Sequence, residues 1–198
     1  MVHSGTDATI SPTKSNTIMV YGDSLSAGYG LPQNTGWVSL LQTKLKRKQL
    51  VYQIINASIS GETTLGGLNR IKKDLHRYRP NIVIVELGAN DGLRGIPIKS
   101  IHSNLESIIK ACKQNKASIL LVGMRLPPNY GKIYTKKFSN IYQQIAKHHE
   151  LRLVPFLLEG FGDKLEYFQD DKIHPNKIAQ EKILINVWKV LQKMIMPN

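Results

Sequence analysis

Cysteine is nearly absent from this chain, which holds one, Cys112, among 198 residues. A single cysteine cannot form an intrachain disulfide, and it leaves the redox compartment undetermined. The surrounding SIIKACKQNK has a helical pattern, in which a small buried hydrophobic residue is more common than a reactive thiol. We therefore interpret Cys112 as a core residue and exclude a cysteine nucleophile.

Long hydrophobic runs are also missing. No apolar stretch approaches the roughly 20 residues that cross a bilayer, so no integral membrane segment is expected. The polar residues 1–16 lack the apolar region of a signal peptide and are predicted to form a flexible N-terminal tail, followed by one domain over residues 17–198. We expect a periplasmic protein if the natural precursor carries a signal peptide, and a cytoplasmic protein otherwise.

The sequence motifs of two other enzyme classes do not occur. The chain has neither an HExxH pair of zinc-binding histidines nor a GxxxxGK[ST] phosphate-binding loop. Metalloprotease and P-loop functions are therefore without motif support. We expect neither a metal site nor a cofactor.

Acidic residues are scarce, because 14 Asp and Glu stand against 27 Lys and Arg and give a net charge of +13. Such an excess points to anionic partners, for example phospholipid surfaces or nucleic acid. The densest basic cluster, residues 44–49, follows Trp37, Leu41 and Leu45 at helical spacing, which is typical of the solvated end of an amphipathic helix. An anionic lipid surface stays open as a partner, and specific nucleic-acid binding is not expected.

Short apolar runs alternate with longer helical patterns along the chain. The predicted strands are residues 17–21, 51–56, 82–87, 118–123 and 151–156. The predicted helices are residues 37–48, 66–76, 98–114, 135–149 and 177–194. Near-continuous apolar strands are typical of sheets that are buried on both faces, and the alternation favours parallel strands joined by helical crossovers. The pattern predicts an α/β domain with helices on both sides of a parallel sheet.

Ser24 follows the first predicted strand directly, in IMVYGDSLSAGYG. Gly22 allows a tight turn there, and the start of a helix presents free N–H groups that can hold negative charge. Serine is also a common helix N-cap, so this stretch alone leaves two interpretations open. A nucleophilic role requires a base and an acid from elsewhere in the chain.

His174 is the histidine that best fits the base, because it lies in QDDKIHPNK after the last predicted strand, whereas His76 and His102 fall in helical patterns. Asp171 precedes it by three residues, a spacing at which the carboxylate can reach the imidazole and fix its tautomer. The alternative is an Asx-type cap of the final helix with an incidental histidine. This motif alone does not decide between the two.

Two further strand ends supply hydrogen-bond donors for the oxyanion of a tetrahedral intermediate. Gly61, in NASISGET, can bring a backbone N–H close to a substrate, and Asn90, in GAND, can donate from its side-chain amide. Each could equally be a simple turn. Their joint placement at strand ends, where α/β sheets bind ligands, favours the catalytic interpretation.

These four blocks, GDSLS at residues 22–26, Gly61 in NASISGET, GAND at residues 88–91 and DKIH at residues 171–174, resemble in order the motifs of the SGNH or GDSL hydrolases. The flanking sequences look like the bacterial thioesterase I, arylesterase and lysophospholipase group, from about residue 17 to the final helix. The resemblance implies a three-layer α/β/α sandwich with a flavodoxin-like, five-stranded parallel sheet.

The resemblance also implies the roles of the site residues. Ser24 would be the nucleophile, His174 the base and Asp171 its orienting acid. The N–H groups of Ser24 and Gly61 and the amide of Asn90 would form the oxyanion hole.

We therefore expect a serine hydrolase that cleaves esters or thioesters of acyl chains through an acyl-enzyme. One alternative is a carbohydrate acetylesterase of the same fold, and another is a basic nucleic-acid-binding module without catalysis. Two loops at strand ends, residues 93–98 and 125–130, are predicted to shape an acyl groove. Its predicted lining residues are Leu93, Ile96, Ile98, Pro127 and Tyr130.

Overall fold

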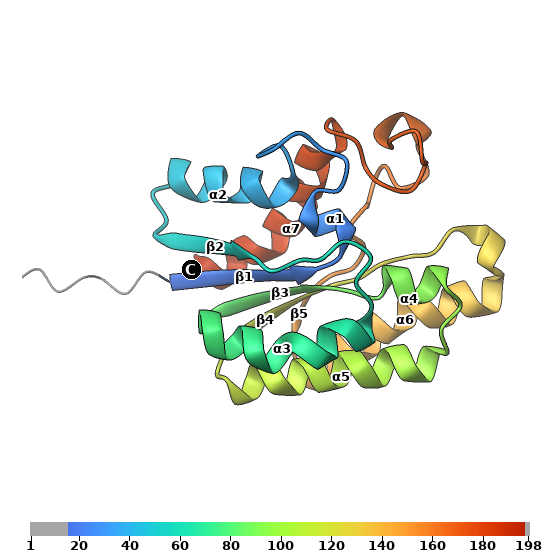
Figure 1. Cartoon of the computed structure of the whole chain (residues 1–198), viewed down its shortest axis with the longest axis horizontal. Helices are drawn as coiled ribbons and strands as arrows, with labels where there is room; N and C mark the ends of the chain where they lie inside the picture. Colours follow the sequence, from blue (N-terminus) through green and yellow to red (C-terminus); the bar gives the residue numbers. More distant parts are fainter. Residues whose placement is uncertain (1–15, 197–198) are drawn as a thin grey trace, which may run out of the picture.

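The fold is a five-stranded parallel sheet between two layers of helices, seen in a computed structural model that describes residues 16–196 (Figure 1). The strands are β1 (Asn16–Gly22), β2 (Tyr52–Asn56), β3 (Ile82–Glu86), β4 (Ser118–Val122) and β5 (Arg152–Val154). They are ordered β2-β1-β3-β4-β5, and every neighbouring pair is parallel. The predicted three-layer α/β/α class is confirmed. The predicted flexible tail lies outside the described residues except for Asn16, where β1 begins.

The helices divide between the two faces of the sheet. They are α1 (Ser24–Ala27), α2 (Trp37–Arg47), α3 (Thr64–Tyr78), α4 (Ala89–Leu93), α5 (Ile98–Gln114), α6 (Lys132–His149) and α7 (Ala179–Ile195), with short 3-10 turns η1 (Pro128–Tyr130) and η2 (Leu165–Tyr167). Figure 1 shows α2 and α7 on one face and α3, α5 and α6 on the other. Within the described residues, none of these helices is both long and apolar enough to cross a membrane.

Strand burial differs from the expectation at both edges of the sheet. The central strand β3 is buried along its whole length, as predicted, and β1 and β4 are buried over most of theirs. The edge strands β2 and β5 are only partly buried, because each has a neighbour on one side only. Strand β5 is also shorter than predicted and stops before Pro155, which lacks an N–H for the ladder.

The chain from the loop predicted at residues 125–130 to the helix predicted from residue 135 contains more regular structure than expected. Its prolines are accommodated in η1, where Pro128 takes the first position of the turn. Gly131 then caps α6, which therefore begins at Lys132 rather than at the predicted residue 135. Helix α3 also begins earlier than predicted, because the Thr63 side chain accepts a hydrogen bond from the Gly66 N–H and caps it.

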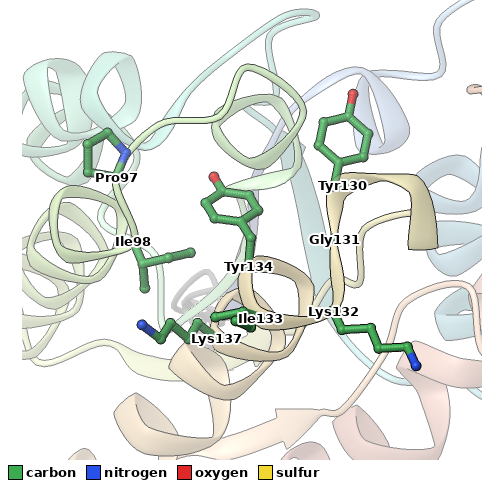
Figure 2. A pocket seen from close by; sticks show the side chains of 8 residues that line it. All are labelled: Pro97, Ile98, Tyr130, Gly131, Lys132, Ile133, Tyr134 and Lys137. Carbon is green, nitrogen blue, oxygen red and sulfur yellow. The ribbon is translucent and has the colours of Figure 1, made fainter.

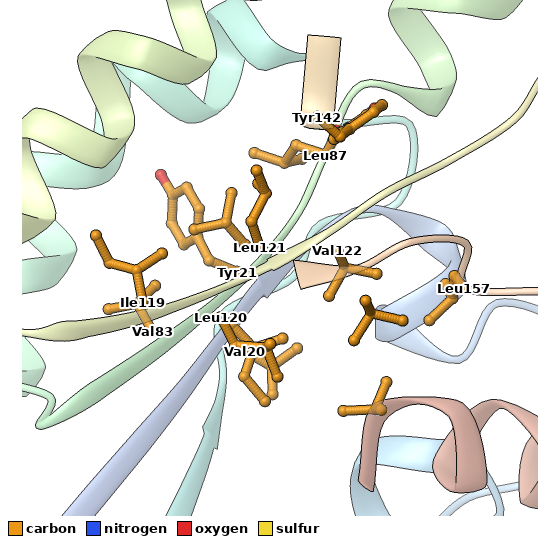
Figure 3. Close-up of a cluster of buried hydrophobic side chains, with 14 of the residues drawn as sticks. Val20, Tyr21, Val83, Leu87, Ile119, Leu120, Leu121, Val122, Tyr142 and Leu157 are labelled. Carbon is orange, nitrogen blue, oxygen red and sulfur yellow. The ribbon is translucent and has the colours of Figure 1, made fainter. Parts of the chain in front are cut away.

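The core consists of the central strands and the inward faces of the helices. Figure 3 shows Val20, Val83, Leu120 and Leu121 packed along three neighbouring strands. Cys112 on α5 is fully buried in this core, as predicted, and burial raises the pKa of its thiol to about 12. Because all strands are parallel, their carboxyl ends meet at one edge of the sheet, where the four sequence blocks come together.

Candidate active site

Ser24 is the first residue of helix α1, directly after strand β1. The helix cap is Asp23, whose carboxylate accepts a hydrogen bond of 3.0 Å from the Leu25 N–H. The N-cap interpretation of Ser24 is therefore wrong, because its neighbour fills that role. The Ser24 hydroxyl points instead to a histidine from the far end of the chain.

Gly22 is required before this turn because a carboxyl group approaches its backbone. A Cβ at position 22 would lie 2.6 Å from Oε2 of Glu86 and 2.9 Å from Oγ of Ser26. Glu86 ends strand β3 and is fully buried, and its Oε2 accepts a 2.7 Å hydrogen bond from the Ser26 hydroxyl. The turn that carries Ser24 is thus built on a buried acid of the neighbouring strand.

Two buried carboxyl groups lie close together below the nucleophile. Burial raises the pKa of Asp23 to about 7, although the hydrogen bond from the Leu25 N–H acts in the opposite direction. Burial and the neighbouring Asp23 raise the pKa of Glu86 well above its usual value. The Oε1 atom of Glu86 has no hydrogen-bond partner among the described residues. No sequence pattern marked this pair, because Glu86 is a single acidic residue within the apolar run predicted as the strand 82–87.

The structure brings Ser24, His174 and Asp171 together as predicted. His174 Nε2 lies 2.9 Å from Ser24 Oγ, and His174 Nδ1 lies 2.6 Å from Asp171 Oδ2. With its proton on Nδ1, the imidazole donates to Asp171 and can accept from the Ser24 hydroxyl. A serine, a base and an orienting acid are therefore in hydrogen-bond reach of one another.

Asp171 also fixes the backbone of its own loop. Its Oδ1 accepts hydrogen bonds of 2.9 Å from the N–H groups of both Ile173 and His174. Partial burial raises the pKa of Asp171, but the hydrogen bonds from His174 and Ile173 outweigh that effect and lower it to about 2. At the start of α7 the N–H groups of Ile178 and Ala179 donate to the side chain of Asn176 and not to Asp171, so the alternative interpretation of Asp171 as a cap of that helix is wrong.

The loop that carries His174 is tied to the loop that follows α1. The Gln169 side chain donates 2.9 Å to the carbonyl of Tyr29, and the Gln169 N–H donates 2.8 Å to the carbonyl of His174. The Tyr29 ring lies against the imidazole, with 4.5 Å between ring centroids. These contacts fix the loop that carries His174 relative to the segment that carries Ser24. Neither Tyr29 nor Gln169 was predicted from the sequence.

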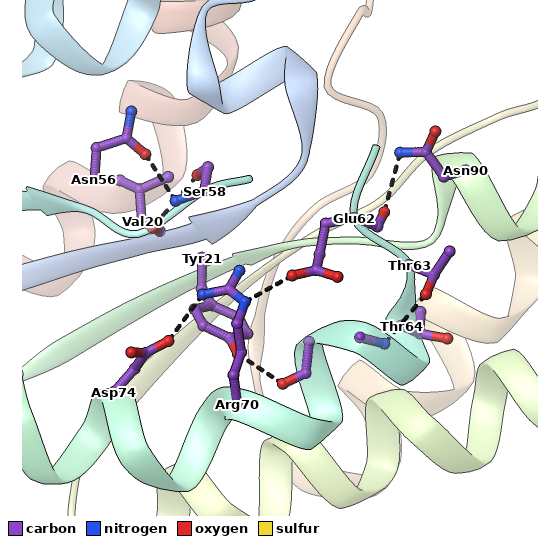
Figure 4. Close-up of polar contacts among 12 residues, drawn as sticks. Val20, Tyr21, Asn56, Ser58, Glu62, Thr63, Thr64, Arg70, Asp74 and Asn90 are labelled. Atoms are coloured by element: carbon purple, nitrogen blue, oxygen red, sulfur yellow. Dashed lines mark hydrogen bonds and ion pairs between the residues drawn. The ribbon is translucent and has the colours of Figure 1, made fainter. Parts of the chain in front are cut away.

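Three predicted oxyanion donors surround the same region. The N–H groups of Ser24 and Gly61 have no hydrogen-bond acceptor among residues 16–196. Gly61 adopts φ +79°, a conformation that other residues rarely take, and it lies in the loop before α3. The Asn90 amide donates 3.0 Å to the Glu62 carbonyl, as Figure 4 shows, and 3.3 Å to Asp23 Oδ2.

The Gly61 loop is anchored by the residue that follows Asn90. Asp91 is buried, and its two carboxylate oxygens accept hydrogen bonds from the N–H and the hydroxyl of Thr64, at 2.8 and 2.6 Å. Asn104 on α5 donates a further 3.0 Å bond to the Thr64 hydroxyl. The GAND block therefore supplies Asn90 and also positions the loop that carries Gly61. The sequence did not predict this second role.

Arg70 also stabilises the loop that carries Gly61. Its guanidinium binds Glu62 at 2.6 Å and Asp74 at 2.8 Å and lies over the ring of Tyr21 (Figure 4). The Tyr21 hydroxyl in turn donates 2.6 Å to the carbonyl of Gly67. Residue 62, whose carbonyl receives the Asn90 amide, is thus held by a partly buried network.

A hollow of about 710 Å³ lies between the start of α5 and the start of α6. Ile98 and Tyr130, two of the predicted groove residues, line it together with Ile133 and Tyr134 (Figure 2). The other predicted residues, Leu93, Ile96 and Pro127, are not in its lining. The backbone of Ile96 instead accepts a 2.7 Å hydrogen bond from the Tyr134 hydroxyl, which fixes one wall.

Residues 20–182 match the profile of the GDSL-like Lipase/Acylhydrolase family. The chain is 44% identical to Esterase TesA from Pseudomonas aeruginosa over 179 residues, which is 90% of this chain and 89% of that protein. It is 41% identical to Thioesterase 1/protease 1/lysophospholipase L1 from Escherichia coli K12, covering 91% and 85%. The solved structure of the psychrotrophic esterase EstA from Pseudoalteromonas sp., inhibited by monoethylphosphonate, superposes with a TM-score of 0.86 at 42% identity, covering 90% of this chain and 98% of that one.

Proposed function

This chain belongs to the GDSL-like lipase/acylhydrolase family, and from that premise we propose that it is a serine hydrolase that cleaves carboxylic esters and thioesters of acyl chains. The single observation that carries the proposal is the 2.9 Å contact between Ser24 Oγ and His174 Nε2, with Asp171 behind the imidazole. The relatives are named as esterases and as a thioesterase and lysophospholipase, which supports this substrate class.

In the proposed reaction, His174 Nε2 accepts the Ser24 proton while Oγ attacks the substrate carbonyl. The imidazolium then protonates the departing alcohol or thiol, and an acyl ester remains on Ser24. His174 next removes a proton from water, which attacks this ester and releases the carboxylic acid. Asp171 stays anionic because of its lowered pKa, and it stabilises the imidazolium in both halves of the reaction.

The carbonyl oxygen becomes an anion in each tetrahedral intermediate. We assign its stabilisation to the N–H groups of Ser24 and Gly61 and to the Asn90 amide. Both amide hydrogens of Asn90 already have acceptors, and the longer bond, 3.3 Å to Asp23, is the one with which a developing oxyanion would compete. A neutral Asp23 holds that hydrogen less strongly than an ionised one.

The acyl chain is proposed to lie toward the hollow lined by Ile98 and Tyr130. The hollow is lined by residues that follow β3 and β4, and β3 is paired with β1, the strand that leads to Ser24. Its volume is in the range of small-molecule pockets. A chain that fills it would gain about 0.8 kcal/mol for each buried methylene.

A carbohydrate acetylesterase would use the same triad and differ only in the acyl pocket. The largely apolar hollow at the starts of α5 and α6, which we assign to the acyl chain, would favour longer acyl chains over acetyl groups, so we place this alternative second. A nucleic-acid-binding module gains no support from the site, because such a module needs no serine in contact with a histidine. The nucleic-acid-binding alternative predicts strongly salt-dependent polynucleotide binding and no covalent labelling of Ser24.

The positive charge supports contact with an anionic lipid surface. Basic side chains occupy the last turns of α2, α3, α5, α6 and α7, which end where the strands begin. Cations there complement the helix dipoles, so the argument for a lipid partner rests on the net charge of +13 rather than on their position. Sedimentation with vesicles of anionic and of neutral lipid at rising salt tests this proposal, because an electrostatic contact must weaken with salt.

The central experiment is Ser24→Ala, with a matched Ser103→Ala on the exposed surface of α5 as control. Ester and thioester hydrolysis should fall by up to about a millionfold in the first variant, by analogy with a serine protease triad, and stay unchanged in the second. An alkylphosphonate should add its mass to the peptide that contains Ser24. Labelling elsewhere, or full activity in Ser24→Ala, contradicts the proposal.

A further inference from the structure

Three potential metal ligands gather at the packing between α5 and α6, away from the serine site. They are Glu106 in the middle of α5 and the pair His148 and His149 at the end of α6. One ligand atom from each of the three lies within 4.8 Å of the others. His149 Nε2 and Glu106 Oε2 are already 2.9 Å apart, and both side chains are largely buried.

We propose that this cluster binds a divalent transition-metal ion such as Zn²⁺. Two imidazoles and one carboxylate form a donor set that suits zinc. Ligand atoms of a tetrahedral zinc site lie about 3.4 Å apart, since the bonds are about 2.1 Å long. The Glu106 and His149 atoms, 2.9 Å apart, must separate by about 0.5 Å to reach this spacing. The ligand atom of the exposed His148 lies within 4.8 Å of both.

The surroundings leave room for the ion and offer a fourth ligand. A hollow of about 590 Å³ opens over Glu106 and His148, and His102 is part of its wall. His102 lies one helical turn before Glu106 on the same face of α5. Its imidazole can therefore approach the same ion from the other side, or a water molecule can take that position.

Two lysines of the same hollow, Lys99 and Lys110, oppose the ion by their charge. Lys110 contacts a proposed ligand. The Lys110 Nζ lies 3.7 Å from Glu106 Oε2. A metal ion bound to that oxygen would be repelled by the ammonium group. The Lys110 side chain is 64% exposed, so it can swing into solvent at little cost. Removing this lysine should strengthen metal binding, a result that a simple ion pair between Glu106 and His149 does not predict.

The site is separate from the hydrolytic machinery. Helix α6 ends just before β5 begins, at the edge of the sheet where the strands start, whereas Ser24 and His174 lie at the carboxyl ends. A metal there joins the middle of α5 to the end of α6. We therefore assign it a stabilising role in the helical layer and no part in ester cleavage.

Titration calorimetry with ZnCl₂ tests the site, using full-length protein without a polyhistidine tag after dialysis against a chelator. We expect one ion per chain, about tenfold or greater loss of affinity in both Glu106→Gln and His148→Ala, and tighter binding in Lys110→Ala. The melting temperature of the wild type should rise with zinc concentration, and that of Glu106→Gln should not. Hydrolysis by His148→Ala should match the wild type.

Two control variants keep the result unambiguous. His76→Ala, on α3, should leave zinc affinity unchanged, and so should His174→Ala. Loss of binding in His174→Ala would place the ion at the serine site and overturn the proposal. The same conclusion follows if Glu106→Gln and His148→Ala, shown to be folded by circular dichroism, bind zinc as the wild type does, or if the wild type binds none. None of these outcomes depends on whether Ser24 is the nucleophile.

Discussion

Asp91 and Thr64 are joined by two hydrogen bonds, because one carboxylate receives both the N–H and the hydroxyl of the threonine. The pair connects the segment after β3 to the first residue of α3, and so fixes the distance between Asn90 and the Gly61 loop. The oxyanion donors that we assign from these two segments are therefore positioned by a contact outside the triad.

Replacing Asp91 by Ala should damage both activity and stability. A buried polar group left without its partner costs about 1–3 kcal/mol, and two groups of Thr64 lose theirs. We expect a lower midpoint of urea unfolding and a fall in kcat that is larger than any change in KM. Asp163→Ala, at an exposed position, serves as the control. Wild-type kcat in a destabilised Asp91→Ala protein would remove the positioning role while leaving the structural one.

Asn90→Ala should lower kcat by about a hundredfold to a thousandfold with little effect on KM, because an oxyanion donor acts mainly on charge that develops in the transition state. Steady-state kinetics on a p-nitrophenyl ester measures both constants. Asn186→Ala, which removes two hydrogen bonds to loop carbonyls elsewhere, controls for general loss of stability. A change confined to KM would make Asn90 a ground-state binding residue.

Glu86→Gln should change how stability depends on pH. The raised pKa of Glu86 means that the folded chain keeps a proton which the unfolded chain releases above about pH 4.5. The folded state then binds more protons, so this group makes unfolding easier as pH rises above that value. Glutamine cannot ionise and removes this contribution.

The measurement is the urea midpoint at pH 5 and at pH 8. The Glu86→Gln protein should gain stability relative to the wild type between these two values, while the exposed Glu150→Gln should show no such gain. Parallel curves for Glu86→Gln and the wild type would mean that Glu86 is already ionised in the folded protein.

Ile98→Ser should penalise long acyl chains more than short ones, because Ile98 lines the hollow beside the start of α6. A panel of p-nitrophenyl esters from acetyl to dodecanoyl gives kcat/KM against chain length. The wild-type slope should flatten in the variant, whereas Ile185→Ser, on the exposed side of α7, should preserve it. Equal losses on acetyl and octanoyl esters contradict the proposed groove, and a wild-type preference for acetylated sugars favours the acetylesterase alternative.

The sequence was sufficient for the sheet, most helices and the meeting of Ser24, Asp171 and His174. Buried parallel strands appear in a sequence as apolar runs. The carboxyl ends of parallel strands lie at one edge of the sheet, so residues that directly follow the strands lie close together. The edge strands β2 and β5 were less predictable, since their partial burial depends on their place in the sheet order. That order is not encoded in any single strand.

Contacts between side chains that are distant in the sequence could not be predicted, for a different reason. Glu86 is one acid in an apolar run, and its role depends on the approach of Gly22 from the neighbouring strand. The Asp91–Thr64 pair and the Glu106–His149 pair join segments 27 and 43 residues apart, with no local pattern to mark them. Such pairings are decided by how helices and loops pack, which composition and periodicity do not specify.

The basic side chains in the last turns of the helices also predict how the molecule would lie on a charged support. We expect a negatively charged bead or film to attract the end where the strands begin, which would turn the opposite edge, with Ser24 and His174, toward the bulk solution. Adsorbed molecules would therefore share one orientation and keep their active sites accessible. Substrate would then reach the serine from the liquid side, and the rate of an immobilised layer would be limited by chemistry or transport rather than by blocked sites.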